Sequence, residues 1–323
     1  MKDHGHPHGR PHRHDAADTM DTAMEASERG LRAVKISFVA LLVTALVQLA
    51  VIVATGSVAL LADTIHNFSD ALTAVPLFIA FRLSRRPATR RYTYGYRRAE
   101  DLAGVFVIAM ITLSAVVAGY EAISRLIDPR PLTNLGWLFA AGLVGFAGNE
   151  LVALYRIRVG RRIGSAALEA DGYHARTDGF TSLAVSLGAI GSWLGFDRAD
   201  PIVGLLITIA IFALLRAAAR QVFRRLMDAV DPDIVDEIEH TASHVAGVRQ
   251  VGAVRARWVG HRLTGSIAVV VDEDLSVREG HEVAEAVRHE MLHAVRHLDD
   301  IDVHIDTDRR DGIDPHVLAR HHH

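Results

Sequence analysis

Two stretches of the chain place a histidine and an aspartate four residues apart inside long apolar segments. The first, LLADTIHNFSDALTAV, contains His66 and Asp70, and the second, LEADGYHARTDGFTSLAV, contains His174 and Asp178. A spacing of four residues places both side chains on one face of a helix. Two such faces together offer two imidazoles and two carboxylates. This tetrahedral ligand set suits Zn²⁺ and is acceptable to Co²⁺ or Cd²⁺.

A plainer interpretation is that these groups form interhelical hydrogen bonds or line a polar crevice without metal. Each unpaired carboxylate inside a membrane costs at least about 2.5 kcal/mol, so two pairs at matched depth favour the metal site. Asn67 and Ser69 are better explained by packing or by support of the ligands. An interhelical bond explains Asn149 and Glu150 better than a ligand role does. For Asp63, an outer vestibule role and a capping or surface role both stay open.

The composition indicates a membrane protein with a soluble part. The apolar runs lie between residues 33 and 220, whereas residues 221–323 are ordinary polar sequence. The chain has no cysteine, so a transition metal must be held by His, Asp or Glu. The net charge of −3 gives no sign of a nucleic-acid partner.

A hydrocarbon core of about 30 Å takes roughly 20 helical residues, and six runs have that length. Arginine-rich loops, such as RIRVGRR, alternate with nearly uncharged ones, which predicts that both termini are cytoplasmic. This orientation brings both histidine–aspartate pairs close to the middle of a bacterial cytoplasmic membrane. The predicted spans are 33–54, 58–82, 101–126, 134–157, 165–191 and 200–220.

Metal binding by histidine also suggests an energy source. Neutral imidazole binds zinc and imidazolium does not, and histidine changes charge near neutral pH. A site that opens alternately to each side would therefore exchange protons for metal. His174 and Asp70 are the candidate proton carriers, the first by its ordinary pKa and the second as a carboxylate in a low dielectric.

The segment 229–308 has the pattern helix, strand, strand, helix, strand, which predicts a small α+β unit. In two of the predicted strands, every second residue is a branched apolar one, as in strands with one buried face. These are Ile267, Val269 and Val271 in SIAVVVD, and Ile301, Val303 and Ile305 in DIDVHID. The helix predicted over 277–298 contains HEMLH, a formal match to a zinc-protease motif. Arg296 and Asp299 stand where the longer motif needs other residues, so we interpret the histidine face as solvated.

The ends of the chain are predicted to be disordered. Residues 1–32 contain the stretch HGHPHGRPHRHD, whose five histidines, glycines and prolines cannot build a core. Weak capture of metal near the inner mouth is one hypothesis for this segment, and a sensor or an artefact is another. Residues 309–323 form the second disordered tail.

These features together resemble the cation diffusion facilitator family. The resemblance rests on six spans, the paired HxxxD motifs, YGYRRAE before the third span, and a cytoplasmic tail of this size. It implies a homodimeric, proton-coupled exporter of divalent metal with a ferredoxin-like cytoplasmic domain. The HxxxD/HxxxD form implies a preference for zinc, with His66, Asp70, His174 and Asp178 as the transport site.

The resemblance also implies roles for charged residues outside the spans. A basic residue at Arg98 would bridge to Asp228 after the sixth span, although an exposed arginine explains Arg98 equally well. His281, His304 and Asp306 match positions where relatives bind metal between subunits.

This second site departs from the family pattern, since Gly252 and Ala268 stand where some relatives have further histidines. His261 could substitute for them. With this substitution, the expected cytoplasmic site is a regulatory metal site formed by His281, His304, Asp306 and His261.

The leading hypothesis is a non-enzymatic secondary transporter that exchanges cytoplasmic zinc for external protons by alternating access in the lipid bilayer. The alternative is a membrane-anchored metal sensor that binds metal without translocating it. Ligands in the middle of the membrane favour transport, because a sensor could keep its site in water. A zinc protease is a distant third hypothesis.

Overall fold

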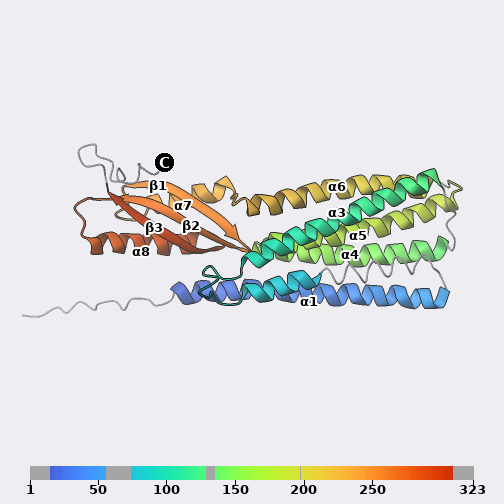
Figure 1. Ribbon diagram of the computed structural model, residues 1–323, viewed down its shortest axis with the longest axis horizontal. Coiled ribbons are helices and arrows are strands. Elements are labelled where there is room, and N and C mark those ends of the chain that lie inside the picture. The colour runs from blue at the N-terminus through green and yellow to red at the C-terminus, as the bar shows by residue number, and fades with distance from the viewer. Residues whose placement is uncertain (1–14, 56–73, 129–134, 197, 308–323) are drawn as a thin grey trace, which may run out of the picture. The chain divides into compact units, whose positions relative to one another are not determined.

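The computed structural model describes residues 15–55, 74–128, 135–196 and 198–307 (Figure 1). The chain divides into two compact units. The helical unit comprises Ala26–Val230 together with Arg257–Arg262. The small unit comprises Asp231–Ala256 and Leu263–His323, together with Met1–Glu25.

The helical unit consists of long helices that match the predicted spans. Its described helices are α1 (Asp15–Thr55) from Ala26 onward, a short helix Ala74–Ser84, α3 (Arg98–Ile127), α4 (Leu135–Ile163), α5 (Ala166–Trp193) and α6 (Ala199–Leu226). Among the described residues, four segments are long and apolar enough to cross a membrane: Glu25–Val47, α3, α4 and α6. Helix α5 is as long, but polar residues interrupt its apolar sequence and it is not among these four segments. Most of the span predicted at 58–82 lies outside the described residues, so the count of six stays a prediction.

The first helix begins earlier than the sequence analysis placed it. Helix α1 starts at Asp15, so residues 15–32 are helical rather than a disordered tail. The stretch is rich in alanine, methionine and glutamate, which favour helix. The apolar segment that follows removes the cost of nucleating a separate helix. The histidine-rich residues 4–14 lie outside the described part of the chain.

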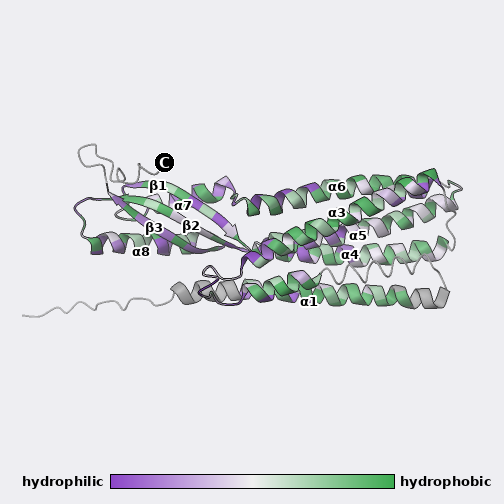
Figure 2. Cartoon of the chain, viewed as in Figure 1, coloured by the Kyte–Doolittle hydropathy of each residue, from purple (hydrophilic) through white to green (hydrophobic). Residues whose placement is uncertain are grey.

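The outer faces of these helices are apolar, as a lipid-facing surface requires. Large side chains such as Leu102, Leu151 and Leu206 are more than 60 % exposed in the isolated chain. Figure 2 shows hydrophobic colour along much of α1, α3 and α6. A helix that is hydrophobic both toward its neighbours and toward the outside is typical of a membrane span.

Helices α4 and α5 form an antiparallel hairpin closed by two residues. Gly164 has a φ of +75°, which a glycine adopts without steric cost, and the Ser165 N–H donates to the carbonyl oxygen of Gly160 at 2.9 Å. The Ser165 hydroxyl in turn accepts from the N–H of Leu168 and caps α5. Because the two caps overlap, α5 runs directly back along α4.

Helix α5 is the most enclosed helix of the unit, packing against α3, α4 and α6. Small residues allow this close approach: Gly172 faces Ile157 and Gly179 faces Asn149 of α4. On its other side, α5 contributes Ala166 and Ala170 to a core with α3 and α6. The chain therefore buries the helix that carries His174 and Asp178.

The small unit has the predicted order of helix, strand, strand, helix, strand, and the prediction of an α+β unit is confirmed. Its elements are α7 (Pro232–Ser243), β1 (Gln250–Val259), β2 (Arg262–Val271), α8 (Val277–Ala294) and β3 (Leu298–Thr307). The strand order is β1-β2-β3, and β2 and β3 are parallel, with Ile267 opposite Val303. Ile267, Val269 and Val271 are buried, as their alternation predicted.

The close packing of α4 on α5 predicts different effects for two glycines of α4. An alanine Cβ at Gly142 would lie 2.6 Å from the backbone oxygen of Ser182, which cannot move alone. The strain, about 1–3 kcal/mol, exceeds the gain in helix propensity of about 1 kcal/mol. Gly142→Ala should therefore lower the unfolding temperature of the purified protein. Gly136→Ala is the control, because its nearest neighbour is 3.9 Å away. Equal effects at both positions would contradict the packing described.

Candidate metal centre

The second histidine–aspartate pair lies on a buried face of α5. His174 is 2 % exposed and Asp178 is 3 % exposed, and His174 Nδ1 lies 3.5 Å from Asp178 Oδ2. His174 follows the start of α5 by eight residues, or about 12 Å along the axis. The two side chains thus present one nitrogen ligand and one carboxylate side by side within the helical unit.

The first pair, His66 and Asp70, lies outside the described residues, as does Asp63. Within the described ranges, no group of three or more His, Asp or Glu side chains is placed to hold a metal ion. The structure therefore supplies half of the predicted ligand set. The other half stays a prediction.

Two arginines that the sequence analysis did not assign to the site form ion pairs between α4 and α5. Arg176 contacts Glu150 through two hydrogen bonds of 2.7 and 3.1 Å, which gives Glu150 the interhelical role expected for it. Arg156 lies 2.9 Å from Asp171, and both side chains are almost fully buried. The available signal was an arginine inside a predicted span, which is rare without a partner.

The tip of the β1–β2 hairpin belongs to the helical unit and is held by buried polar contacts. Gly260, with a φ of +62°, and His261 form the two-residue turn. His261 Nδ1 lies 2.8 Å from Glu100 Oε1, and the N–H of Gly260 donates to Asp101. His261 and Glu100 are 3 % and 1 % exposed. The ring of His261 is thereby engaged at the start of α3.

The predicted partners Arg98 and Asp228 form an ion pair in the structure, with 2.9 Å between Nη2 and Oδ1. Asp228 follows the end of α6 with a φ of +56°, a helix-terminating conformation that aspartate tolerates better than most residues. Arg257 lies 3.9 Å from the same carboxylate. The pair therefore connects the start of α3, the end of α6 and the hairpin tip.

In the small unit, His304 and Asp306 lie together but His281 does not join them. His304 Nε2 is 3.6 Å from Asp306 Oδ1 on β3. Side chains alternate along a strand, and Ile305, between these two, faces Gly280 of α8. His281 follows Gly280 on that helix, which covers the opposite face of the sheet. One chain therefore does not bring the three residues together, and His261 belongs to the other unit.

The departures from the family pattern lie beside His304. Ala268 is directly opposite His304 in the β2–β3 register, and a Cβ on Gly252 would lie 3.1 Å from Ala268. Positions 252, 268 and 304 thus form a row across three strands. Because the first two are glycine and alanine, the row provides a single imidazole.

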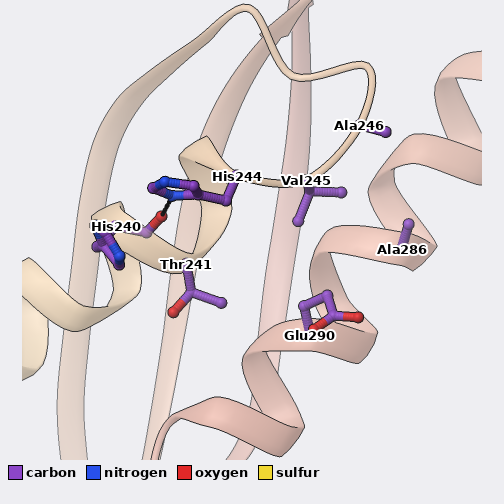
Figure 3. Close-up of a pocket in the computed structure, with 7 residues that line it drawn as sticks. All are labelled: His240, Thr241, His244, Val245, Ala246, Ala286 and Glu290. Carbon is purple, nitrogen blue, oxygen red and sulfur yellow. Dashed lines mark hydrogen bonds between the residues drawn. The ribbon is translucent and has the colours of Figure 1, made fainter.

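A hollow of about 380 Å³ lies between α7 and α8 (Figure 3). His240 and His244 lie next to one another on its α7 side, where His244 Nδ1 hydrogen-bonds the carbonyl oxygen of His240, and Glu290 faces it from α8. Both histidines of HEMLH, His289 and His293, are exposed. This part of the small unit agrees with the expected solvated face rather than a protease site.

Comparison with known proteins identifies the family. The family model for the cation efflux transmembrane domain matches residues 34–227, and that for the cation efflux protein cytoplasmic domain matches residues 230–308. The chain belongs to the cation diffusion facilitator family. Members of this family are transporters rather than enzymes, so this cation efflux protein is not a zinc protease.

Relatives of this cation efflux protein cover most of its length. It is 59 % identical over 306 residues to a Mycobacterium tuberculosis protein named "Probable cation efflux system protein", covering 91 % of this chain and 92 % of the relative. It is 24 % identical to the manganese efflux system protein MneP of Bacillus subtilis, covering 87 % and 98 % of the two chains.

Similar solved structures cover only part of the cation efflux protein. A nickel form of the MamM CTD is 28 % identical, with a TM-score of 0.24. It covers 24 % of this chain and 100 % of that one.

The buried pair at the hairpin tip predicts a double-mutant result. His261→Ala leaves the Glu100 carboxylate buried without this partner and should destabilise the cation efflux protein by about 3 kcal/mol. Glu100→Ala should cost about 1–3 kcal/mol, because the imidazole loses its acceptor. The double variant should be more stable than the sum of the two losses predicts, since contacting residues couple. Denaturant unfolding in detergent measures this, with exposed His281→Ala as a near-neutral control. Strict additivity would show that the pair contributes nothing.

Proposed function

We propose that this chain exports a divalent cation, Zn²⁺ in the first place, from the cytoplasm in exchange for protons. His66, Asp70, His174 and Asp178 would form the transport site. The observation that carries this proposal is the buried placement of His174 beside Asp178 inside a helical membrane unit. Metal ligands enclosed by spanning helices can bind an ion on its way across the bilayer. A sensor does not need ligands at that depth, where polar groups are costly to bury.

The choice of zinc rests on the ligand chemistry. Two imidazoles and two carboxylates suit a four-coordinate ion, whereas manganese prefers more ligands and more oxygen. The names of relatives widen the range of candidate metals, since one is a manganese efflux protein and others are the magnetosome protein MamB. Co²⁺ and Cd²⁺ are the other candidate substrates for this donor set.

Proton coupling follows from the ligands themselves. A histidine must lose its proton to bind metal, so each cycle of loading and release is linked to proton movement. His174 on α5 and Asp70 are the candidate carriers. With both termini in the cytoplasm of a bacterial cell, inward proton flow would drive outward metal flow.

A second chain would complete the cytoplasmic site. His304 and Asp306 offer two ligands from one face of the sheet, and His281 lies on the helix covering the other face. A homodimer could bring the His281 of a second chain to this pair, which one chain cannot do. Metal bound there would strengthen the dimer when cytoplasmic metal is high.

The test of transport is metal flux into proteoliposomes of known orientation, with and without an imposed pH gradient. Gradient-driven zinc flux is expected in the wild type, and Asp70→Ala and His174→Ala should each reduce it to background, because each removes a metal ligand. Cobalt, cadmium and manganese measured in parallel rank the substrates.

His289→Ala, which removes an exposed histidine of α8, is the matched control and should retain flux. Tight zinc binding by the wild type without flux under any gradient would refute transport. That result would leave the membrane-anchored sensor as the function.

The cytoplasmic site predicts metal-dependent association. Zinc should raise the dimer fraction of the wild type in sedimentation experiments, and His304→Ala should abolish this increase because it removes the imidazole beside Asp306. His293→Ala, an exposed histidine of α8, serves as the control. Unchanged zinc-dependent association in His304→Ala would exclude a regulatory role for this pair.

A further inference from the structure

A guanidinium and a carboxylate are enclosed together between α4 and α5. Arg156 Nη1 lies 2.9 Å from Asp171 Oδ2, and the two side chains are 2 % and 0 % exposed. Arg156 has the largest of the fully buried side chains in the described residues. Gly172 makes room for it, because a Cβ there would lie 3.1 Å from the Cβ of Arg156.

The pair is poorly satisfied for groups so deeply buried. Within the described part of the chain, Nε and Nη2 of Arg156 and both carboxylate oxygens of Asp171 have no hydrogen-bond partner of good geometry. Burial of an ion pair is favourable only when the remaining donors and acceptors are satisfied. By contrast, Arg176 and Glu150, on the same two helices, form two hydrogen bonds. The Arg156–Asp171 ion pair therefore contributes little to the stability of the α4–α5 contact.

Its position relates it to the candidate metal centre. Asp171 precedes His174 by three residues, so the two side chains lie on neighbouring parts of one helix face, about one turn apart. Asp171 is the nearer of the two to the Gly164–Ser165 turn. That turn follows the arginine-rich end of α4, which the proposed orientation places at the cytoplasmic side.

We propose that Asp171 is an additional cation-binding residue on the cytoplasmic approach to His174 and Asp178. When no metal ion is bound, the guanidinium group of Arg156 pairs with the Asp171 carboxylate in its place. The ligand is a divalent cation that still keeps part of its hydration shell, since one carboxylate cannot replace it. This inference rests on the proposed function of the site.

Charge explains why the two residues occur together. An unpaired carboxylate beside the site would hold a divalent cation too tightly for onward transfer, and an unpaired guanidinium would repel it. Paired, the two residues are neutral, and an arriving cation competes with Arg156 for Asp171. Because Nε and Nη2 of Arg156 and both carboxylate oxygens of Asp171 have no hydrogen-bond partner among the described residues, the competing contact is weak and exchange is possible.

The test is equilibrium binding of Zn²⁺ to the purified full chain by titration calorimetry. Arg156→Gln removes the competitor and should tighten binding at the transport site, whereas Asp171→Asn leaves the guanidinium unpaired and should weaken it. A change of about tenfold in each direction is expected for a charge this close in a low dielectric. Titration of each variant combined with His174→Ala corrects for zinc held by surface histidines.

Opposite shifts at Arg156 and Asp171 that are absent at the neighbouring Arg176–Glu150 pair distinguish a cation-binding carboxylate from a general effect of nearby charge. If the pair only supports the fold, both substitutions should act in the same direction or leave affinity unchanged, and either result overturns the proposal. Arg176→Gln and Glu150→Gln, at the other α4–α5 ion pair, are the matched controls and should not shift affinity in opposite directions. Arg156→Gln combined with Asp171→Asn provides an uncharged pair of side chains at the same two positions. The elution volume of this double variant in size-exclusion chromatography and its unfolding temperature, both compared with the wild type, show whether an effect on affinity comes from misfolding.

The proteoliposome flux assay and the calorimetry together separate two kinds of failure. Absence of gradient-driven flux in the wild type would refute the proposed transport. The calorimetry would still decide independently whether Arg156 and Asp171 act on cation binding. Normal flux and zinc binding in the wild type, with no opposite shifts in the variants, would refute only the role of Arg156 and Asp171.

Discussion

The antiparallel contact of α4 with α5 is the constraint on which the rest of the helical unit depends. Gly164 and Ser165 end one helix and begin the next within two residues, so the two helices stay in register along their whole length. Small residues then bring the backbones close enough to exclude solvent. Every charged group on the facing sides must therefore find its partner across this contact.

Three consequences of that register lie along α5. Asp171 meets Arg156, Arg176 meets Glu150, and His174 remains beside Asp178. Two of these contacts neutralise charge between the helices, while the third keeps its partner on its own helix. The pair on α5 therefore places a nitrogen and a carboxylate side by side on one face of a single helix.

A second set of contacts gathers where the hairpin tip reaches the ends of the helices. His261 and Glu100 are buried together, and Arg225 stacks on the Trp258 ring while its guanidinium donates to the carbonyl oxygen of Gly164. The same turn that sets the α4–α5 register is thus bound from the end of α6. A displacement of the tip would disturb the turn, and through it the helix that carries His174.

The sequence by itself determined the family, the non-enzymatic role and the α+β pattern of the small unit, because hydropathy period and motif spacing are local properties of the chain. It also predicted the shared face of His174 and Asp178, since a spacing of four residues fixes neighbours on any helix. Apart from Arg98 and Asp228, which the family resemblance paired, only the tertiary structure decided which charges meet. Arg156 reads as one more arginine at the inner end of a predicted span until the α4–α5 register brings it to Asp171. His261 reads as a free ligand until the tip is enclosed against Glu100, and His281 is separated from His304 only by the choice of sheet face. Such pairings depend on how separate helices and strands pack against one another, which no local pattern records.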